Sequence, residues 1–365
     1  MNGFTGTRPA IGLALSGGGF RATAFGLGCL RALHDRDLLS QVRVVSGISG
    51  GGLLAAMWAY GPPAFDEFDD SVTTLLGRGM QWDLVRRALS PGSVVRNAVA
   101  SARALPLLPG RQPREASRTD ALVAALASQP FGSREISDVT HPCLDTVISA
   151  TDLASTNAVR FGSARSSCSA YGDILDQVTV AEAVAASAAF PLLLPALTRT
   201  YQFESRNGER LQRAISMTDG GVYDNLGLSS LLPGRSRAFT SHVYDLDYLI
   251  AADSGRGRAT QRAALHLPGR LKRSFDIAYN KAQDGGRAQL NAAAAGWLRG
   301  FVHAYLGMRD SRLPSPVADF VHREGVIDYP TDFASVPPAD LRRLTLRGEQ
   351  LTRTLLSHYC PELGS

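Results

Sequence analysis

The chain is poor in lysine, which occurs only at Lys272 and Lys281, so arginine supplies almost all of the 38 basic side chains. Arginine pairs with phosphate in a bidentate way, and a basic surface can favour anionic lipid or nucleic acid. The net charge is only +5 over 365 residues, however, and the arginines are spread along the chain. This spread favours an ordinary solvated surface, and we expect no nucleic-acid partner.

Cysteine is also scarce. The chain contains four cysteines and none has C-x-x-C spacing, which argues against a zinc site or a redox pair. Cys29 and Cys143 lie in apolar stretches and are predicted to be buried thiols, which suits a reducing, cytoplasmic compartment. No set of His, Cys, Asp and Glu residues has the spacing of metal ligands, so we expect neither a metal ion nor another cofactor.

Long apolar runs are absent. No uninterrupted stretch approaches the roughly 18 apolar residues that indicate a membrane-spanning helix. The first residues lack the basic region, apolar run and cleavage site of a signal peptide. We therefore expect any membrane contact to be peripheral.

Short apolar runs alternate with helical patterns near the start of the chain. Residues 11–16 form a short apolar run, followed by three glycines, that predicts a buried strand. Residues 21–39 predict a helix. A second strand is predicted at 42–48 and a second helix at 51–60. This order predicts an α/β fold with a mostly parallel central sheet flanked by helices.

Residues 61–135 differ from their surroundings, because they are rich in Gly-Pro pairs and arginine and have weaker periodicity. They predict a helical insertion that could act as a lid. Seven of its arginines, interspersed with apolar residues, could contact an anionic bilayer, although a solvated insertion explains them equally well. These residues are Arg86, Arg87, Arg96, Arg103, Arg111, Arg114 and Arg118.

The rest of the chain returns to strand-like content at 144–153, 158–163 and 246–255. Between these stretches, residues 179–195 predict an alanine-rich helix that stops at Pro191. The residues after about 259 predict mainly helices.

The first glycine-rich loop, "SGGGFRA" at 16–22, lies between a predicted strand and a predicted helix. Successive backbone N–H groups at a helix start form an anion site. A P-loop is excluded because G-x-x-x-x-G-K-[ST] is absent, and a dinucleotide site is disfavoured because Ala22 replaces the third glycine. The remaining candidate is an oxyanion site. Arg21 either stabilises the edge of the sheet at this loop or bridges parts of the core.

Ser49 interrupts the second glycine-rich stretch and permits two interpretations. A serine before a helix commonly caps it. Gly47 and Gly51 also complete G-x-S-x-G, the nucleophile elbow that exposes a serine hydroxyl on a strained turn. If the two predicted strands are parallel neighbours, both glycine-rich turns lie at the same sheet edge.

A nucleophilic serine needs a base. His242, His303 and His358 all follow Ser49, but only 48 residues precede it, too few for the strands that precede an α/β-hydrolase elbow. The better candidate is Asp219, which follows a strand-like run and precedes Gly220 and Gly221. Asp-Gly also caps ordinary turns, so Asp219 is a base only beside an elbow serine.

Four motifs occur in the order seen in patatin-like phospholipases: "GGGFR" at 17–21, "GISGG" at 47–51, "AASAAFP" at 185–191 and "DGGVYDNLG" at 219–227. The sequence resembles this family, whose relatives include cytosolic phospholipases A2, over roughly residues 10–255. The resemblance implies a catalytic domain at 10–255 that includes the insertion. Residues 256–365 lie outside the resemblance, and their pattern predicts a mainly helical extension packed on that domain. One departure is Ala22, where the family motif usually ends in glycine.

The resemblance implies that Ser49 is the nucleophile and Asp219 the general base of a lipid acyl hydrolase. The N–H groups of Gly17, Gly18 and Gly19 would form the oxyanion hole, and "AASAAFP" would pack near the site. The alternatives are a latent or regulatory lipid-binding module that needs an activator, and a nucleotide-binding switch built on the first glycine loop. Supporting roles fall to Arg21, Gly47, Gly50, Gly51, Gly220 and Gly221.

Overall fold

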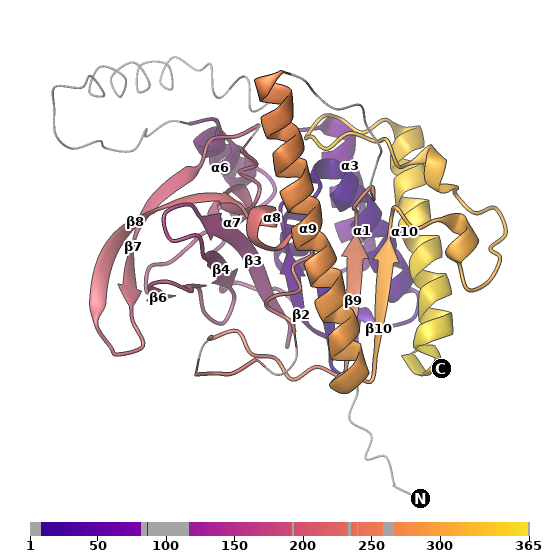
Figure 1. Ribbon diagram of the computed structural model, residues 1–365, viewed down its shortest axis with the longest axis horizontal. Helices are drawn as coiled ribbons and strands as arrows, with labels where there is room; N and C mark the ends of the chain where they lie inside the picture. Colours follow the sequence, from indigo (N-terminus) through magenta and orange to yellow (C-terminus); the bar gives the residue numbers. More distant parts are fainter. Residues whose placement is uncertain are drawn as a thin grey trace, which may run out of the picture.

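The computed structural model describes residues 9–81, 86, 117–191, 193–232, 235–238, 240–257 and 266–363. Within these residues ten strands form one sheet, in the order β10-β9-β1-β2-β3-β4-β5-β6-β7-β8, with helices packed beside it (Figure 1). The chain therefore has the α/β fold that the sequence predicts. The strands are β1 Ile11–Leu15, β2 Val42–Gly47, β3 Asp145–Asp152, β4 Ala158–Gly162, β5 Ser167–Cys168, β6 Gly172–Ile174, β7 Leu197–Glu204, β8 Arg210–Asp219, β9 Tyr248–Asp253 and β10 Gly300–Tyr305.

The sheet has two halves. Strands β10, β9, β1, β2 and β3 pair in parallel. From β3 to β8 all pairings are antiparallel, and β3 pairs with both β4 and β8, so this half closes on itself. The expected mostly parallel sheet is therefore confirmed only in part. The connections from β3 to β6 and from β7 to β8 are too short for the crossover that parallel neighbours need.

The register of the parallel strands aligns their carboxyl ends. Leu15 at the end of β1 lies opposite Gly47 at the end of β2 and opposite Ala252 near the end of β9. The loops that follow these strands therefore meet at one edge of the sheet, as expected for both glycine-rich turns.

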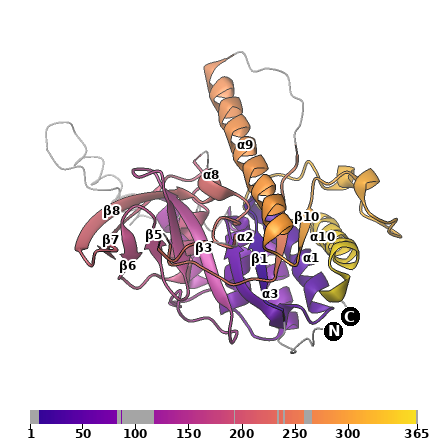
Figure 2. The ribbon, with the colours of Figure 1, turned by 60° about the horizontal axis from the view of Figure 1, so that its bottom comes forward.

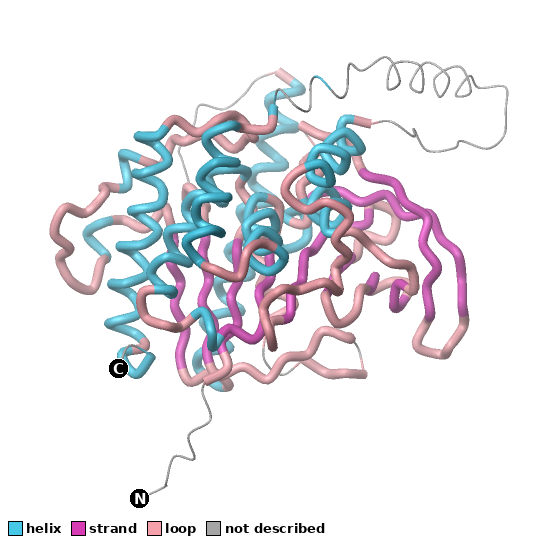
Figure 3. Tube along the Cα trace, turned by 180° about the vertical axis from the view of Figure 1, so that it is seen from behind, coloured by secondary structure: helices cyan, strands magenta, loops and turns pink. Residues whose placement is uncertain are grey.

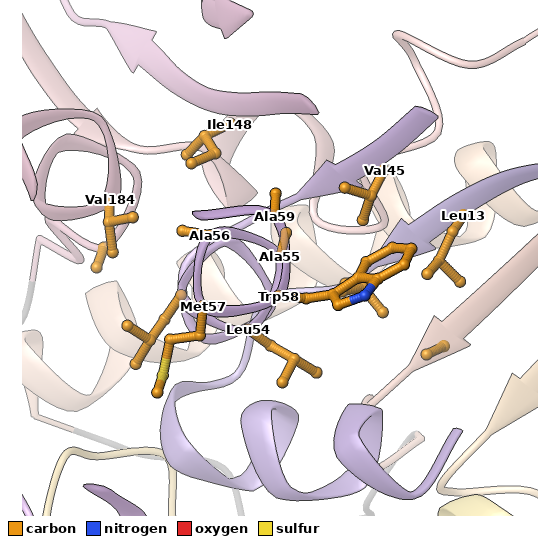
Figure 4. Packing of buried hydrophobic residues seen from close by; sticks show 14 of the residues in the cluster. Leu13, Val45, Leu54, Ala55, Ala56, Met57, Trp58, Ala59, Ile148 and Val184 are labelled. Carbon is orange, nitrogen blue, oxygen red and sulfur yellow. The ribbon is translucent and has the colours of Figure 1, made fainter. Parts of the chain in front are cut away.

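Apolar side chains of the parallel strands pack on both faces of the sheet. Leu13 of β1 belongs to the larger core cluster, whereas its neighbour Ala14 belongs to a smaller cluster that includes Leu290 of α9. The buried helix α2 belongs to the larger cluster, where it lies near Ile148 of β3 and Val184 of α7 (Figure 4). Helices on this side are seen together from behind in Figure 3. The helices are α1 Gly19–His34, α2 Gly50–Tyr60, α3 Phe65–Arg78, α6 Arg118–Ser128, α7 Val180–Ser187, α8 Gly221–Asp224, α9 Leu267–Gly296 and α10 Pro338–Tyr359.

Two local predictions need correction. The helix predicted at 21–39 runs from Gly19 to His34, because the residues after it turn before β2. Cys29 is buried in α1 as predicted, but Cys143 is exposed, since it lies in the turn before β3 with a φ of 63°.

The predicted insertion begins with α3 and ends with α6, while residues 82–85 and 87–116 lie outside the described part. Of the seven arginines considered above as bilayer contacts, only Arg86 and Arg118 are described, and both are exposed. A lid at 61–135 stays a prediction.

After β9 the described chain forms the long helix α9, which projects beyond the body of the molecule (Figure 2). It then adds β10 to the sheet and packs α10 near α1. The strand β10 was not predicted, and the division at residue 255 stays a prediction. No helix among the described residues is long and apolar enough to cross a membrane.

Candidate active site

Ser49 occupies the sharp turn between β2 and α2. Its backbone has φ 52° and ψ −119°, an unusual conformation for a residue other than glycine. Such a conformation costs roughly 1–3 kcal/mol and persists only where its surroundings impose it. The side chain makes no capping hydrogen bond to α2, so the interpretation of Ser49 as a side-chain helix cap is wrong.

Asp219 ends β8 and faces Ser49. Its carboxylate is buried, and Oδ1 accepts a hydrogen bond of 2.7 Å from the Gly221 N–H. Burial raises the pKa of Asp219 to about 6, against the smaller lowering effects of hydrogen bonds from the Gly221 N–H and the Ser49 hydroxyl. The carboxylate is therefore largely ionised at neutral pH and lies within reach of the serine proton.

The end of α7 holds these two turns together. The Ser187 hydroxyl accepts a hydrogen bond of 2.8 Å from the Ser49 N–H. The carbonyls of Ser187 and Ala189 accept hydrogen bonds from the N–H groups of Gly220 and Asp219, at 3.2 and 3.0 Å. The sequence predicted only a packing role for this motif, although Ser187 is the one polar side chain in "AASAAFP" and was the available signal.

The first glycine loop connects β1 to α1. Gly18 and Gly19 have φ of 146° and 59°, in the region that favours glycine. Their N–H groups have no hydrogen-bond acceptor among the described residues. The Gly17 N–H, in contrast, donates to the Asn225 carbonyl at 3.0 Å. The prediction of Gly17 as an oxyanion donor is therefore wrong in this structure, because its donor is already engaged.

The two glycine-rich turns are in direct contact. A Cβ atom on Gly50 would lie 2.0 Å from the Gly19 carbonyl oxygen, so only glycine allows this approach. The remaining predicted glycines lie in the same turns or beside Asp219: Gly47 ends β2, Gly51 lies in the first turn of α2, and Gly220 and Gly221 follow β8.

Arg21 bridges α1 to distant parts of the chain. Its guanidinium donates hydrogen bonds to the Ser254 carbonyl at 3.2 Å, to the Tyr329 carbonyl at 2.9 Å and to Thr331 Oγ1 at 2.6 Å. Of the two roles left open for Arg21, these contacts support bridging. Ala22 is buried in the first turn of α1, where alanine fits without strain.

A cavity of about 700 Å³ opens over Ser49, Asp219 and the glycine loop. No histidine is among the described residues that line it. His242 instead lies 3.2 Å from Ser167 Oγ, and His303 lies 2.9 Å from Asp253. The histidines considered as bases thus have partners elsewhere, or, for His358, a ring contact with Tyr359 on α10.

Both apolar and charged side chains line the cavity, and the charged ones include Glu324, Asp328 and Asp332 as well as arginines. Its apolar residues are Ala188, Phe190, Leu193, Ile327 and Phe333, and its arginines are Arg21, Arg256, Arg273 and Arg323. Sequence reasoning identified Arg21 and, through the motif "AASAAFP", placed Ala188 and Phe190 near the site. It identified none of the other residues, and those around 327–333 belong to no recognised motif.

The fold is similar to that of human GIVD cytosolic phospholipase A2, at 13% sequence identity and a TM-score of 0.57 over 95% of this chain and 59% of that one. The same human enzyme in complex with methyl gamma-linolenyl fluorophosphonate matches at 16% identity and a TM-score of 0.51, over 95% and 57% of the two chains. VipD from Legionella pneumophila matches at 16% identity and a TM-score of 0.42, over 96% and 67%.

This chain thus spans less than two thirds of the human enzyme's length. No match was found among curated proteins. The family model for patatin-like phospholipases matches residues 13–232, more than half of the chain, and the chain therefore belongs to the patatin-like phospholipase family.

Proposed function

We propose that the protein hydrolyses carboxylic ester bonds of lipids, with Ser49 as the nucleophile and Asp219 as the general base. One observation carries this proposal. Ser49 has a strained backbone and a side chain that does not cap α2, and it lies beside the buried Asp219 carboxylate in one cavity. Membership of the patatin-like phospholipase family supports lipid hydrolysis in general.

The first step forms an acyl-enzyme. Asp219 accepts the Ser49 proton as Oγ attacks the ester carbonyl carbon, and a tetrahedral oxyanion develops. The N–H groups of Gly18 and Gly19 are the donors for this oxyanion, since their hydrogen bonds are not used elsewhere in the described chain. One such donor is typically worth about 10²–10³ in rate.

Loss of the alcohol completes the first step, and hydrolysis of the acyl-enzyme is the second. The protonated Asp219 donates its proton to the leaving alcohol or lysolipid, and the ester bond breaks. Asp219 then removes a proton from water as the water attacks the acyl carbonyl, and it returns that proton to Ser49 Oγ as the acyl–Oγ bond breaks. The carboxylic acid is released and Ser49 is regenerated. A pKa of about 6 suits both directions of proton transfer near neutral pH.

The apolar residues of the cavity would contact the acyl chain. Phe190 and Leu193 follow α7, and Ile327 and Phe333 come from the segment before α10. Leu193 is also 41% exposed. An exposed apolar residue at the cavity supports peripheral contact with a lipid surface, from which the substrate enters.

The test is acyl release from a fluorogenic short-chain ester and from mixed phospholipid vesicles. Wild type would be compared with Ser49→Ala, with Asp219→Asn and with a control, Ser71→Ala, which removes a serine hydroxyl that bonds within α3. Each variant is checked for folding by circular dichroism. We expect activity in wild type and the control only, and activity that survives Ser49→Ala would reject the proposal.

A further inference from the structure

Arg256 lies in the catalytic cavity, in the loop that follows β9. Its side chain is half-buried and makes one hydrogen bond within the described residues, from Nη2 to Thr331 Oγ1 at 3.2 Å. A guanidinium has five N–H donors, so most of those on Arg256 have no acceptor in the described chain. Burial lowers the pKa of Arg256, whereas the nearby negative charge of Asp328 acts in the opposite direction.

Two guanidinium groups converge at this point. Arg21 Nη1 donates to the same Thr331 Oγ1, at 2.6 Å. Arg323 also holds this loop in place. Its side chain donates hydrogen bonds to the carbonyls of Gly307 and Arg256, at 3.1 and 3.4 Å. The loop that carries Arg256 is thereby held at the cavity.

Besides Asp219, three carboxylates line the cavity, those of Glu324, Asp328 and Asp332. Glu324 lies 3.7 Å from Arg323, and Asp332 accepts a hydrogen bond from the Ala334 N–H at 3.1 Å. Asp328 is exposed to solvent. No ion pair joins Arg256 to a carboxylate among the described residues, so its guanidinium retains the capacity to bind an anion.

We propose that Arg256 and Thr331 bind the phosphate group of a phospholipid whose ester carbonyl lies at Ser49. The inference rests on the proposed function and specifies its substrate. A guanidinium fork matches the geometry of phosphate oxygens, and the Thr331 hydroxyl both orients the guanidinium and can donate its own proton to a phosphate oxygen. The cavity thus contains apolar residues that could hold the acyl chain and, at Arg256 and Thr331, donors that could hold the head group.

The experiment compares two substrates with the same acyl chains, a phosphatidylcholine and the corresponding diacylglycerol, in the same detergent micelles. The variants are Arg256→Gln, Arg256→Lys and a control, Arg342→Gln, which removes an exposed arginine of α10. We expect Arg256→Gln to lower the phospholipid-to-diacylglycerol ratio of kcat/KM by about 10- to 100-fold, the effect of one charged hydrogen-bonded contact. Arg256→Lys should lower it less, and the control should leave it unchanged.

An unchanged ratio in Arg256→Gln would overturn the proposal. Inhibition by inorganic phosphate distinguishes a lipid phosphate group from free phosphate as the bound anion. If phosphate inhibits wild type through Arg256 while the ratio stays unchanged, the site binds a free anion and the head-group assignment is wrong.

Binding provides a readout that does not need turnover. A soluble short-chain phosphatidylcholine would be titrated into Ser49→Ala and into Ser49→Ala/Arg256→Gln by calorimetry. If wild type hydrolyses neither substrate, the proposed function fails, but the titration still tests whether Arg256 binds the head group. Binding weakened about 10-fold or more by Arg256→Gln supports it, and equal binding by the two proteins rejects it.

Discussion

The Ser187 hydroxyl accepts a hydrogen bond of 2.8 Å from the backbone N–H of Ser49. Both residues are buried, and the Ser187 carbonyl also accepts the N–H of Gly220, next to Asp219. One residue at the end of α7 therefore contacts both turns of the candidate site. Its role is to position the nucleophile, since no described contact places it on the reacting groups.

Ser187→Ala should lower kcat more than it changes KM. It leaves the buried Ser49 N–H without its acceptor, which costs about 1–3 kcal/mol, and it removes a restraint on the strained turn. Steady-state kinetics and urea unfolding measure the two effects. Ser71→Ala is the control in α3, and Ser187→Ala with wild-type kcat would contradict a positioning role.

The pH dependence of kcat/KM should follow the ionisation of Asp219. Burial raises its pKa to about 6, and only the carboxylate can accept the Ser49 proton. Activity should therefore fall as pH decreases through about 6 and level off above it. The profile is measured with a soluble ester whose own ionisation does not change in this range. A profile that is flat from pH 5 to 8 would be inconsistent with Asp219 as the base.

Asp219→Asn should stabilise the fold at neutral pH. The folded pKa of about 6 exceeds the ordinary value of 3.8, so the fold disfavours the carboxylate. Wild type should lose stability relative to Asn as pH rises from about 4 to 6, by about 3 kcal/mol at 1.36 kcal/mol for each pKa unit. Urea unfolding of both proteins at several pH values measures the difference.

Asp253, at the end of β9, provides a control of opposite sign. Burial acts to raise its pKa, but hydrogen bonds and charges from His303 and Arg287 outweigh this effect and hold the pKa at about 2. This carboxylate stabilises the fold above about pH 4, and the contribution is lost as pH falls through about 2. Asp253→Asn should therefore destabilise the protein at neutral pH. If both Asn variants shifted the free energy of unfolding in the same direction, the claim that the fold raises the pKa of Asp219 and lowers that of Asp253 would be contradicted.

Gly50→Ala should abolish activity or folding, because its Cβ would lie 2.0 Å from the Gly19 carbonyl oxygen. Separating the two turns moves Ser49 away from the N–H groups of Gly18 and Gly19. Gly77→Ala in α3 is the matched control, since a Cβ there meets nothing within 4 Å. It should raise stability by about 0.5–1 kcal/mol and leave activity unchanged. Wild-type turnover by Gly50→Ala would show that the contact between the turns is dispensable.

Much of the parallel half of the fold could be predicted from the sequence. The short apolar runs at β1 and β2 each end in glycine-rich turns, and parallel strands bring such turns to one edge. The strand β10 was missed because the pattern after residue 259 is dominated by helices. The closed antiparallel half was missed because strands such as β5 contain only two residues.

The candidate site was predictable where a motif marks it and not elsewhere. Ser49 and Asp219 stand in motifs, and the structure brings them together in one cavity. The engagement of the Gly17 N–H by Asn225 depends on a contact between distant segments. Arg256 and Thr331 follow no local pattern, since they meet only through the packing of the segment before α10 onto the loop after β9.

Covalent capture of the nucleophile tests the central proposal most directly. An alkyl fluorophosphonate forms a phosphorus–oxygen bond to an activated serine and releases fluoride. Peptide mass spectrometry of the treated protein would locate the adduct. We predict a single adduct on Ser49 in wild type, formed much more slowly in Asp219→Asn. An adduct on another residue, or equally fast labelling of Ser49→Ala, would contradict the assignment of Ser49 as the nucleophile.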